Sequence, residues 1–327
     1  MNRRESLAAL FALGLSSGSL RAARDGVPRI GYLSLHSIAE RPSRERQAFL
    51  DGLRDFGLVP RESVEMVYRS AENEPIFMRP MCEELLREKV DVLATPGAIA
   101  TLAALRTTST VPIVFLAMGD PVGIGVSDSL ARPTRNATGT TFIATELAGK
   151  RIELLKLAVP TAKRVAFLSD QRNRNGQLEA DSARAAAKNV GIISEAIPVA
   201  TQAELNSAFV RIAARPHDAL YVSFTAGVIA DNRTSIVEFG LRNRIPVISG
   251  WRFMTEAGGL FSYAPDVLAM FRRSAYYVYR ILNGANPADL PIERATSVKL
   301  LVNLSTARRL GLTLPTELLL RADRVIE

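Results

Sequence analysis

Residues 90–120 read VDVLATPGAIATLAALRTTSTVPIVFLAMGD, and this stretch decides the expected fold. Two apolar runs, at 90–94 and 111–116, have the continuous hydrophobic character of strands that are covered on both faces. Between them, residues 99–107 have the composition of a helix that packs on such strands. Strand, helix and strand in this order form one unit of a parallel sheet, because parallel strands need a crossover connection.

The same alternation extends along the rest of the chain. Further strands are expected where β-branched and apolar residues cluster, at 29–33, 64–68, 164–168, 192–198, 219–224, 245–249 and 298–303. Helices are expected at 44–56, 75–88, 146–157, 177–189, 202–214, 229–243 and 266–282. This alternation is typical of α/β proteins with doubly wound sheets.

The alternation occurs in two series, over 29–142 and over 164–250. We therefore expect an α/β fold of two doubly wound, Rossmann-like lobes joined by a hinge, with chain crossings near 141–145 and at Gly250. Ligands of such sheets bind beyond the carboxyl ends of the strands. Lobe 1 is expected to comprise 27–142 plus 251–290, and lobe 2 to comprise 143–250 plus 291–327.

The N-terminal residues have the order of a secretory signal peptide, expected over 1–25. Arg3 and Arg4 are followed by the apolar run LAALFALGL (7–15) and by small residues at 16–19. The run is too short to span a bilayer. The pattern indicates export to the periplasm by the Sec route or, since Arg3 and Arg4 loosely match its motif, by the twin-arginine route. The alternative is an N-terminal helix docked on the domain.

Composition limits the classes of protein that this chain can be. The 327 residues carry 41 Lys and Arg against 33 Asp and Glu, and the surplus is spread rather than clustered with aromatic residues, so nucleic-acid binding is not expected. Cys82 is the only cysteine, which excludes an internal disulfide and a cysteine metal site. No cysteine lies near the expected signal peptide, so a lipid anchor is not expected. Cys82 itself is expected to be a small buried hydrophobe.

The sequence offers no usable motif for catalysis or cofactor binding. The segment GLSSG (14–18) matches the G-x-S-x-G nucleophile pattern, but it lies inside the expected signal peptide with no strand before it. The only histidines are His36 and His217, and neither a P-loop nor a G-x-G-x-x-G pattern occurs. His217 precedes a strand and is expected in a solvated turn. No cofactor or metal is expected, and the composition argues against an enzyme, although carboxylate chemistry stays open.

The strand ends of the first series carry residues suited to recognition. Ser34 and His36 follow the first strand, and His36 could touch a ligand there. The turn Thr95-Pro96-Gly97-Ala98 opens a helix whose free N–H groups suit a carboxylate. Asp120 follows the fourth strand and could pair with an ammonium group. The alternative for Thr95–Ala98 and for Asp120 is an ordinary capped turn.

The second series has its own candidates. Asn175 lies in the polar segment that follows the strand at 164–168, and Phe224 follows the strand at 219–224. Trp251, the only tryptophan, stands at an expected crossing. It could form the wall of a site for an apolar or aromatic side chain, or it could be hinge packing.

With these residues in place, the chain resembles the ABC-transporter substrate-binding proteins of the tryptophan/tyrosine-type family, which have the type I periplasmic-binding-protein fold. The resemblance runs nearly end to end. It rests on RIGYLS (29–34), AFLDGLRDFG (48–57), VDVLATPG (90–97), VPIVFLAMGDPVGIG (111–125), ATGTTF (137–142), KRIELLKLAVP (150–160), GGLFSY (258–263), YVYRILNGANPADLPIE (277–293) and LLVNLSTARRLGLTLP (300–315). The chain departs from the family pattern at SDQRNRNG (169–176) and at His36.

The resemblance implies capture of a small solute, typically an amino acid, between the lobes and its delivery to a membrane permease. It implies that Ser34, Thr95–Ala98 and Asp120 line the cleft on the first lobe. Asn175, Phe224 and Trp251 would line the other side or the hinge. A monomer that closes around its ligand is expected. The alternatives are a binding protein that feeds a signalling receptor and a secreted α/β enzyme.

Overall fold

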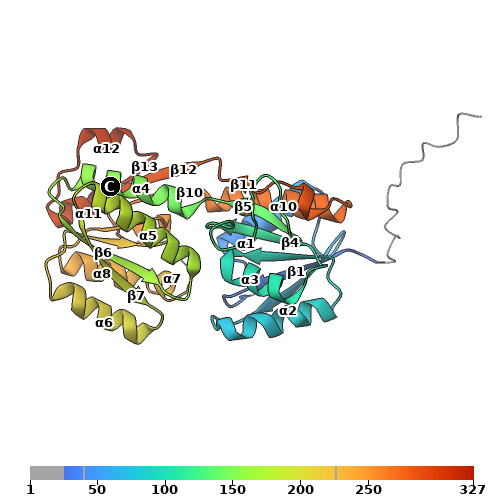
Figure 1. Ribbon diagram of the computed structural model, residues 1–327. Coiled ribbons are helices and arrows are strands. Elements are labelled where there is room, and N and C mark those ends of the chain that lie inside the picture. The colour runs from blue at the N-terminus through green and yellow to red at the C-terminus, as the bar shows by residue number, and fades with distance from the viewer. Residues whose placement is uncertain (1–25, 40, 225–226) are drawn as a thin grey trace, which may run out of the picture.

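The computed structural model describes residues 26–39, 41–224 and 227–327 and shows two α/β lobes side by side (Figure 1). Each lobe is built on one sheet with helices packed against it. The expected signal peptide over 1–25 lies outside the described residues. In the described part of the chain, no helix is long and apolar enough to cross a membrane.

The sheet of lobe 1 has the strand order β11-β5-β4-β3-β1-β2, and every pairing in it is parallel. Its strands are β1 (Arg29–Ser34), β2 (Glu65–Ser70), β3 (Val92–Pro96), β4 (Ile113–Met118), β5 (Ala137–Thr141) and β11 (Glu293–Arg294). The helices of this lobe are α1 (Arg44–Asp55), α2 (Met78–Arg87), α3 (Gly97–Thr107) and α10 (Val267–Leu282), with short 3₁₀ turns at Pro75–Phe77 and Pro287–Asp289. Although it comes late in the chain, α10 lies beside β4 and β5 (Figure 1).

The sheet of lobe 2 has the strand order β13-β12-β10-β9-β8-β6-β7, in which only the β10–β12 pair is antiparallel. Its strands are β6 (Arg164–Asp170), β7 (Ile193–Val199), β8 (Ala219–Val222), β9 (Val247–Ser249), β10 (Phe261–Pro265), β12 (Val298–Asn303) and β13 (Arg324–Ile326). Its helices are α4 (Ala144–Ala158), α5 (Arg174–Asn189), α6 (Gln202–Ala213), α7 (Val228–Asp231), α8 (Arg233–Arg242), α9 (Arg252–Glu256), α11 (Leu304–Leu310) and α12 (Thr316–Leu320).

The two sheets repeat one topology. The order β2-β1-β3-β4-β5 in lobe 1 recurs as β7-β6-β8-β9-β10 in lobe 2. This confirms the expectation of two doubly wound lobes. In such a sheet the strand order reverses between the first and third strands, and ligands bind beyond the carboxyl ends at that point. The functional loops are therefore those that follow β1 and β3 in one lobe and β6 and β8 in the other.

Strand pairing corrects the expected division between the lobes at two segments. Residues 251–265 were expected in lobe 1, but β10 pairs with β9 and with β12, and so it belongs to the second sheet. Residues 291–294 were expected in lobe 2, but β11 pairs with β5 of the first sheet. The second crossing consequently lies between β10 and α10 rather than at Gly250. The chain crosses a third time between β11 and β12.

Apolar residues fill both faces of each sheet. In lobe 1, α1 and α10 cover one face through Phe49 and Tyr277, and α2 covers the other through Leu85 and Cys82. Cys82 is fully buried, which confirms the expectation of a small buried hydrophobe. The strand β5 escapes sequence prediction because its residues, ATGTT, lack an apolar run, even though all of them are buried.

Candidate functional site

The carboxyl ends of the two sets of parallel strands meet at the junction between the lobes. At this junction the backbone N–H of Asp120, just after β4, donates a hydrogen bond of 3.0 Å to Oδ1 of Asn175 on α5. Gly119 lies against the same side chain, since a Cβ atom built there would stand 2.8 Å from the Asn175 amide. The end of β4 and the start of α5 thus form a direct contact between lobes.

Asn175 is held in place by the way α5 begins. The side chain of Asn173 caps this helix and accepts hydrogen bonds from the backbone N–H groups of Asn175 and Gly176. Asparagine is favoured at a cap because its side-chain oxygen replaces the missing backbone acceptor. Asn175 is buried, so its amide is committed to the junction between the lobes.

Asp120 has one oxygen engaged in its own turn. Oδ1 accepts a hydrogen bond of 2.9 Å from the backbone N–H of Gly123, which is the turn-capping arrangement left open for this residue. The side chain is only half-buried. A carboxylate has two oxygens and several acceptor positions, so the capping bond leaves Oδ2 able to accept another donor.

The turn from Thr95 to Ala98 is organised from inside lobe 1. The Thr95 side chain is fully buried, and its hydroxyl lies 2.9 Å from that of Thr101, which donates to the Gly97 carbonyl. The Thr95 hydroxyl therefore supports the turn and does not reach the junction. Gly97 begins α3 with φ of +71°, and a Cβ there would have nothing within 4 Å, so the space over the turn is open. Among the described residues, no side chain caps α3, so its first N–H groups are the donors at this point.

Ser34 and His36 stand at the neighbouring end of β1. Ser34 is buried, and its carbonyl accepts the backbone N–H of Ala71 at 3.0 Å. His36 is half-buried, with Nδ1 2.7 Å from Oδ1 of Asn73. Since β1 pairs with both β2 and β3, these residues lie between the loop that follows β2 and the turn that opens α3.

Three aromatic rings join the lobes. Phe224 stacks on Trp251 with ring centroids 4.0 Å apart, and Phe142 meets Phe224 edge-on at 4.5 Å. Phe142 belongs to the core of lobe 1, whereas Trp251 packs on that of lobe 2. Phe224 and Trp251 also line a small cavity together with Pro265 and Val267, where the chain crosses between lobes. Trp251 therefore makes the contacts of a residue that packs at the hinge, which is one of the two roles considered for it from the sequence.

A buried ionic network beneath the aromatic rings escaped sequence reasoning. Arg151 of α4, Glu179 of α5 and Tyr221 of β8 are fully buried. Arg151 Nη1 donates to Glu179 Oε1 at 2.7 Å, and the Tyr221 hydroxyl donates to the same oxygen at 2.8 Å. Burial raises the pKa of Glu179, while the charge of Arg151 and the hydrogen bonds lower it. Arg151 lies within the largely apolar segment KRIELLKLAVP, and this position could have indicated a buried charge. Its partners come from distant elements, so the sequence could not identify them.

The network fixes the loops that carry the aromatic residues. Glu179 Oε2 accepts the backbone N–H of Phe224 at 2.7 Å. A Cβ atom on Gly250, just before Trp251, would stand 2.6 Å from Arg151 Nη2. Only a residue without a side chain permits this approach, so the network positions Phe224 on one loop and requires glycine on the other.

The second histidine differs from its expectation. His217 is buried, and Nε2 lies 3.2 Å from Oε2 of Glu195, while Nδ1 lies 3.0 Å from the Arg215 carbonyl. It is an internal residue at the amino end of β8, not part of a solvated turn, because α6 and β7 enclose it. In the part of the chain that the structure describes, no cluster of histidine, cysteine and acidic residues could hold a metal ion.

Two sheets of the same doubly wound topology, with a direct contact between the lobes and three crossings, have the fold of the type I periplasmic binding proteins. The sequence identifies the family. The chain belongs to the ABC transporter substrate binding protein family, whose sequence profile matches residues 34–326. This confirms the resemblance inferred from the sequence motifs. Proteins of this family bind small solutes outside the cytoplasm and work with an ABC permease.

Individual relatives are similar over most of the chain. A tyrosine-binding protein of Clostridioides difficile (strain R20291) is 23% identical over 285 residues, which cover 86% of this chain and 81% of the relative. The structure of an ABC domain in complex with L-Trp from Streptococcus pneumonia is 24% identical, with a TM-score of 0.85 over 92% of this chain and 100% of that one. A ligand-free, open substrate binding protein from Clostridium difficile is also 24% identical, with a TM-score of 0.67 over 92% and 99%.

Proposed function

We propose that this protein captures an amino acid between its lobes and delivers it to an ABC permease, as a monomeric periplasmic carrier without a membrane anchor and without catalytic activity. The observation that carries the proposal is the contact between Asp120 and Asn175, which brings the strand ends of both lobes to one place. The tyrosine and tryptophan in the names of the two relatives support an amino acid as the solute. Export by the Sec or the twin-arginine route completes the proposal.

The carboxylate of the solute would be held at the start of α3. The first N–H groups of that helix lie beside Gly97 and Ala98, and a helix N-terminus carries partial positive charge. The open space over Gly97 gives the ligand access to these groups. Ser34 stands on the adjacent strand, so its hydroxyl would be a further donor to the carboxylate, while Thr95 stiffens the turn from inside.

The ammonium group of the solute would pair with Asp120, whose Oδ2 is not needed to cap the turn. His36 and Asn175 would contribute polar contacts from either side, and Phe224 would contact an apolar or aromatic side chain of the solute. Trp251 would act through Phe224, because the two rings are stacked. A solute that touches both lobes favours the closed arrangement by its differential affinity for that arrangement.

A thermal-shift screen of the purified mature protein against amino acids tests the proposal. A ligand that binds only the folded state raises the melting temperature by mass action. We expect one L-amino acid to raise it, and titration calorimetry to give much weaker binding for the matching amine without a carboxylate and the matching acid without an ammonium group. No response from any amino acid would contradict the proposal.

Two further measurements test the role of Asp120 and the absence of catalytic activity. Asp120→Asn keeps an acceptor for the Gly123 N–H but loses the charge, so it should weaken amino-acid binding without unfolding the protein. Unchanged affinity would remove the ammonium role of Asp120. Mass spectrometry of the solute after incubation should recover it unaltered, whereas turnover would overturn the non-catalytic assignment.

A further inference from the structure

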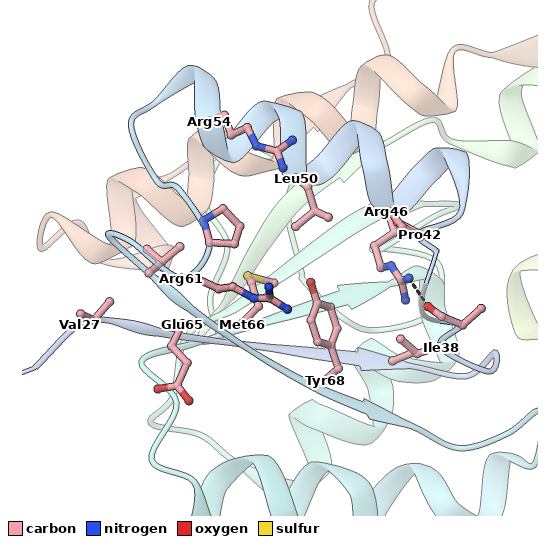
Figure 2. A pocket seen from close by; sticks show the side chains of 13 residues that line it. Val27, Ile38, Pro42, Arg46, Leu50, Arg54, Arg61, Glu65, Met66 and Tyr68 are labelled. Carbon is pink, nitrogen blue, oxygen red and sulfur yellow. Dashed lines mark hydrogen bonds between the residues drawn. The ribbon is translucent and has the colours of Figure 1, made fainter.

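A large pocket lies on lobe 1, away from the junction between the lobes. It has a volume of about 870 Å³ and is bounded by α1, the strand β2 and the loop that precedes α1 (Figure 2). Since β2 is the edge strand of its sheet, no further strand lies beyond this pocket in the described sheet. The volume falls in the range of pockets that hold small organic ligands, roughly 300–1,000 Å³.

The floor of the pocket is apolar. Met66 and Tyr68 lie two residues apart on β2 and so point to the same side of the sheet. Leu50 of α1 and Ile38 of the preceding loop complete this floor. A ligand with an apolar or aromatic body would remove these surfaces from water, which is the main favourable contribution to binding of such a body.

A buried positive charge stands at one end of the floor. Arg46 is only 7% exposed, and its guanidinium lies 5.5 Å from the centre of the Tyr68 ring. Its one side-chain hydrogen bond among the described residues goes from Nη2 to the carbonyl of Ala39 (Figure 2). A guanidinium has five N–H donors, and within the described ranges no carboxylate forms an ion pair with this one. A buried guanidinium whose remaining N–H groups donate to no described residue can donate them to an anion that reaches it.

A second arginine approaches from the opposite side of Tyr68. Figure 2 shows the side chains of Arg61 and Arg46 on either side of the Tyr68 ring in this view. Arg61 and Tyr68 line the same pocket, and burial raises the pKa of Tyr68 while the charges of Arg46 and Arg61 act in the opposite direction. Arg61 stands in a tight turn with φ of 72°, closed by a 2.9 Å hydrogen bond from its N–H to the Val64 carbonyl.

The acidic residue that lines the pocket does not neutralise these charges. Among the described lining residues only Glu65 is acidic, and it pairs with Arg29 at 2.7 Å. Arg54, which also lines the pocket, pairs with Asp51 at 2.6 Å. Among the described lining residues, Arg46 and Arg61 are therefore the arginines that form no ion pair with a described carboxylate, and both can meet a ligand.

We propose that this pocket is a second ligand site, which binds a small organic carboxylate with an apolar or aromatic body. The carboxylate lies between Arg46 and Arg61 and accepts the Tyr68 hydroxyl, while the body lies on Leu50 and Met66. Because arginine matches a carboxylate in charge and geometry, two of them select an anion over a neutral compound of equal size. The site is separate from the one proposed between the lobes and does not depend on it.

Titration calorimetry with octanoate tests the proposal, with the neutral octanamide as its matched control. We expect octanoate to bind and octanamide to bind at least about tenfold more weakly, as expected when a charge-assisted hydrogen bond is lost. Arg61→Gln should weaken octanoate by about tenfold for the same reason. The matched control is Arg106→Gln, which removes an exposed arginine of α3 outside the pocket and should leave octanoate binding unchanged.

The methyl NMR signal of Met66 reports separately on where octanoate binds. This signal is assigned as the one that disappears from the spectrum of the Met66→Leu variant. Octanoate should shift this signal, and inorganic sulfate should displace octanoate only weakly because it lacks the apolar body. Failure of octanoate to bind, equal binding in Arg61→Gln, an unmoved Met66 signal, or displacement by sulfate at equal concentration would each overturn the proposal. Arg61 is exposed, so its replacement does not threaten the fold.

Discussion

At the residue scale, the ionic network of Arg151, Glu179 and Tyr221 is the feature on which the junction most depends. The three side chains come from α4, α5 and β8, and their hydrogen bonds support the Phe224 loop and the approach of Gly250. Such a network rigidifies its surroundings when its groups are paired, and destabilises them when one partner is removed. We expect it to set the geometry of the Phe224–Trp251 stack.

Replacing Glu179 should therefore destabilise the fold strongly. Glu179→Gln leaves the buried guanidinium of Arg151 without its counter-charge, which costs about 3 kcal/mol or more of unfolding free energy. Tyr221→Phe removes two hydrogen bonds, the one donated to Glu179 and the one accepted from Arg151, and should cost about 2 kcal/mol. Urea denaturation measures both changes. The exposed pair of Arg321 and Glu317 is the control, since Glu317→Gln should cost less than about 0.5 kcal/mol. Equal costs for Glu179→Gln and Glu317→Gln would contradict the structural role of the network.

Cys82 gives a second test at this scale. Burial raises the pKa of its thiol to about 11, and the side chain has no exposed surface. Because the thiolate is the reactive form, we expect Ellman's reagent to label the native protein only as fast as the protein opens, and the unfolded protein within minutes. Rapid labelling of the native protein would show that α2 does not pack as described.

At the scale of elements, the order of strands and helices follows from the sequence because buried parallel strands have continuous apolar runs. Elements without that signal were not predicted. Among them are β5, whose ATGTT is buried but weakly apolar, and the short strands β11 and β13. The positions of the candidate residues at strand ends were predictable from topology, but their hydrogen-bond partners were not. The contacts of Asp120 with Asn175, and of Thr95 with Thr101, depend on side-chain directions that no local pattern specifies.

The contact between the end of β4 and the start of α5 makes Gly119 a sensitive position. A methyl group there would stand 2.8 Å from the Asn175 amide, so Gly119→Ala should push the lobes apart. We expect the amino-acid affinity measured by calorimetry to fall about tenfold or more, since the closed arrangement becomes less populated. The control is Gly149→Ala on α4, where the nearest atom to the new methyl is 3.9 Å away. Affinity that is equal in the two variants would argue against closure through this contact.

The tie between β11 and α10 predicts a pH dependence. Arg273 donates two hydrogen bonds to Glu293, of 2.7 and 2.6 Å, and holds the pKa of that carboxyl below its ordinary value of 4.5. A lowered pKa in the folded state stabilises the protein above pH 4.5, and this contribution is lost as the pH falls through the folded-state pKa. The unfolding free energy of Glu293→Gln should therefore depend less on pH below pH 4.5 than that of the wild type, as measured by urea titrations at several pH values. An equal pH dependence in both proteins would assign the effect to other carboxyl groups.

At the scale of the whole molecule, two copies of one topology face each other across three crossings. The two series of alternating strands and helices were evident in the sequence, but the position of the second crossing was not. The strand at 261–265 could join either sheet, and its place beside β9 depends on non-local pairing. The pocket of Arg46 and Arg61 was unpredictable for a related reason. Its walls come from α1, β2 and the turns beside them, and the sequence does not show that these leave a space at the sheet edge.

Capture of an amino acid between the two lobes should change the overall shape of the molecule. Small-angle X-ray scattering of the mature protein, without and with a saturating concentration of the amino acid found in the thermal-shift screen, tests it most directly. We expect a smaller radius of gyration in the presence of the amino acid, because a solute that touches both lobes favours the closed arrangement. An unchanged scattering curve at full saturation would contradict capture between the lobes.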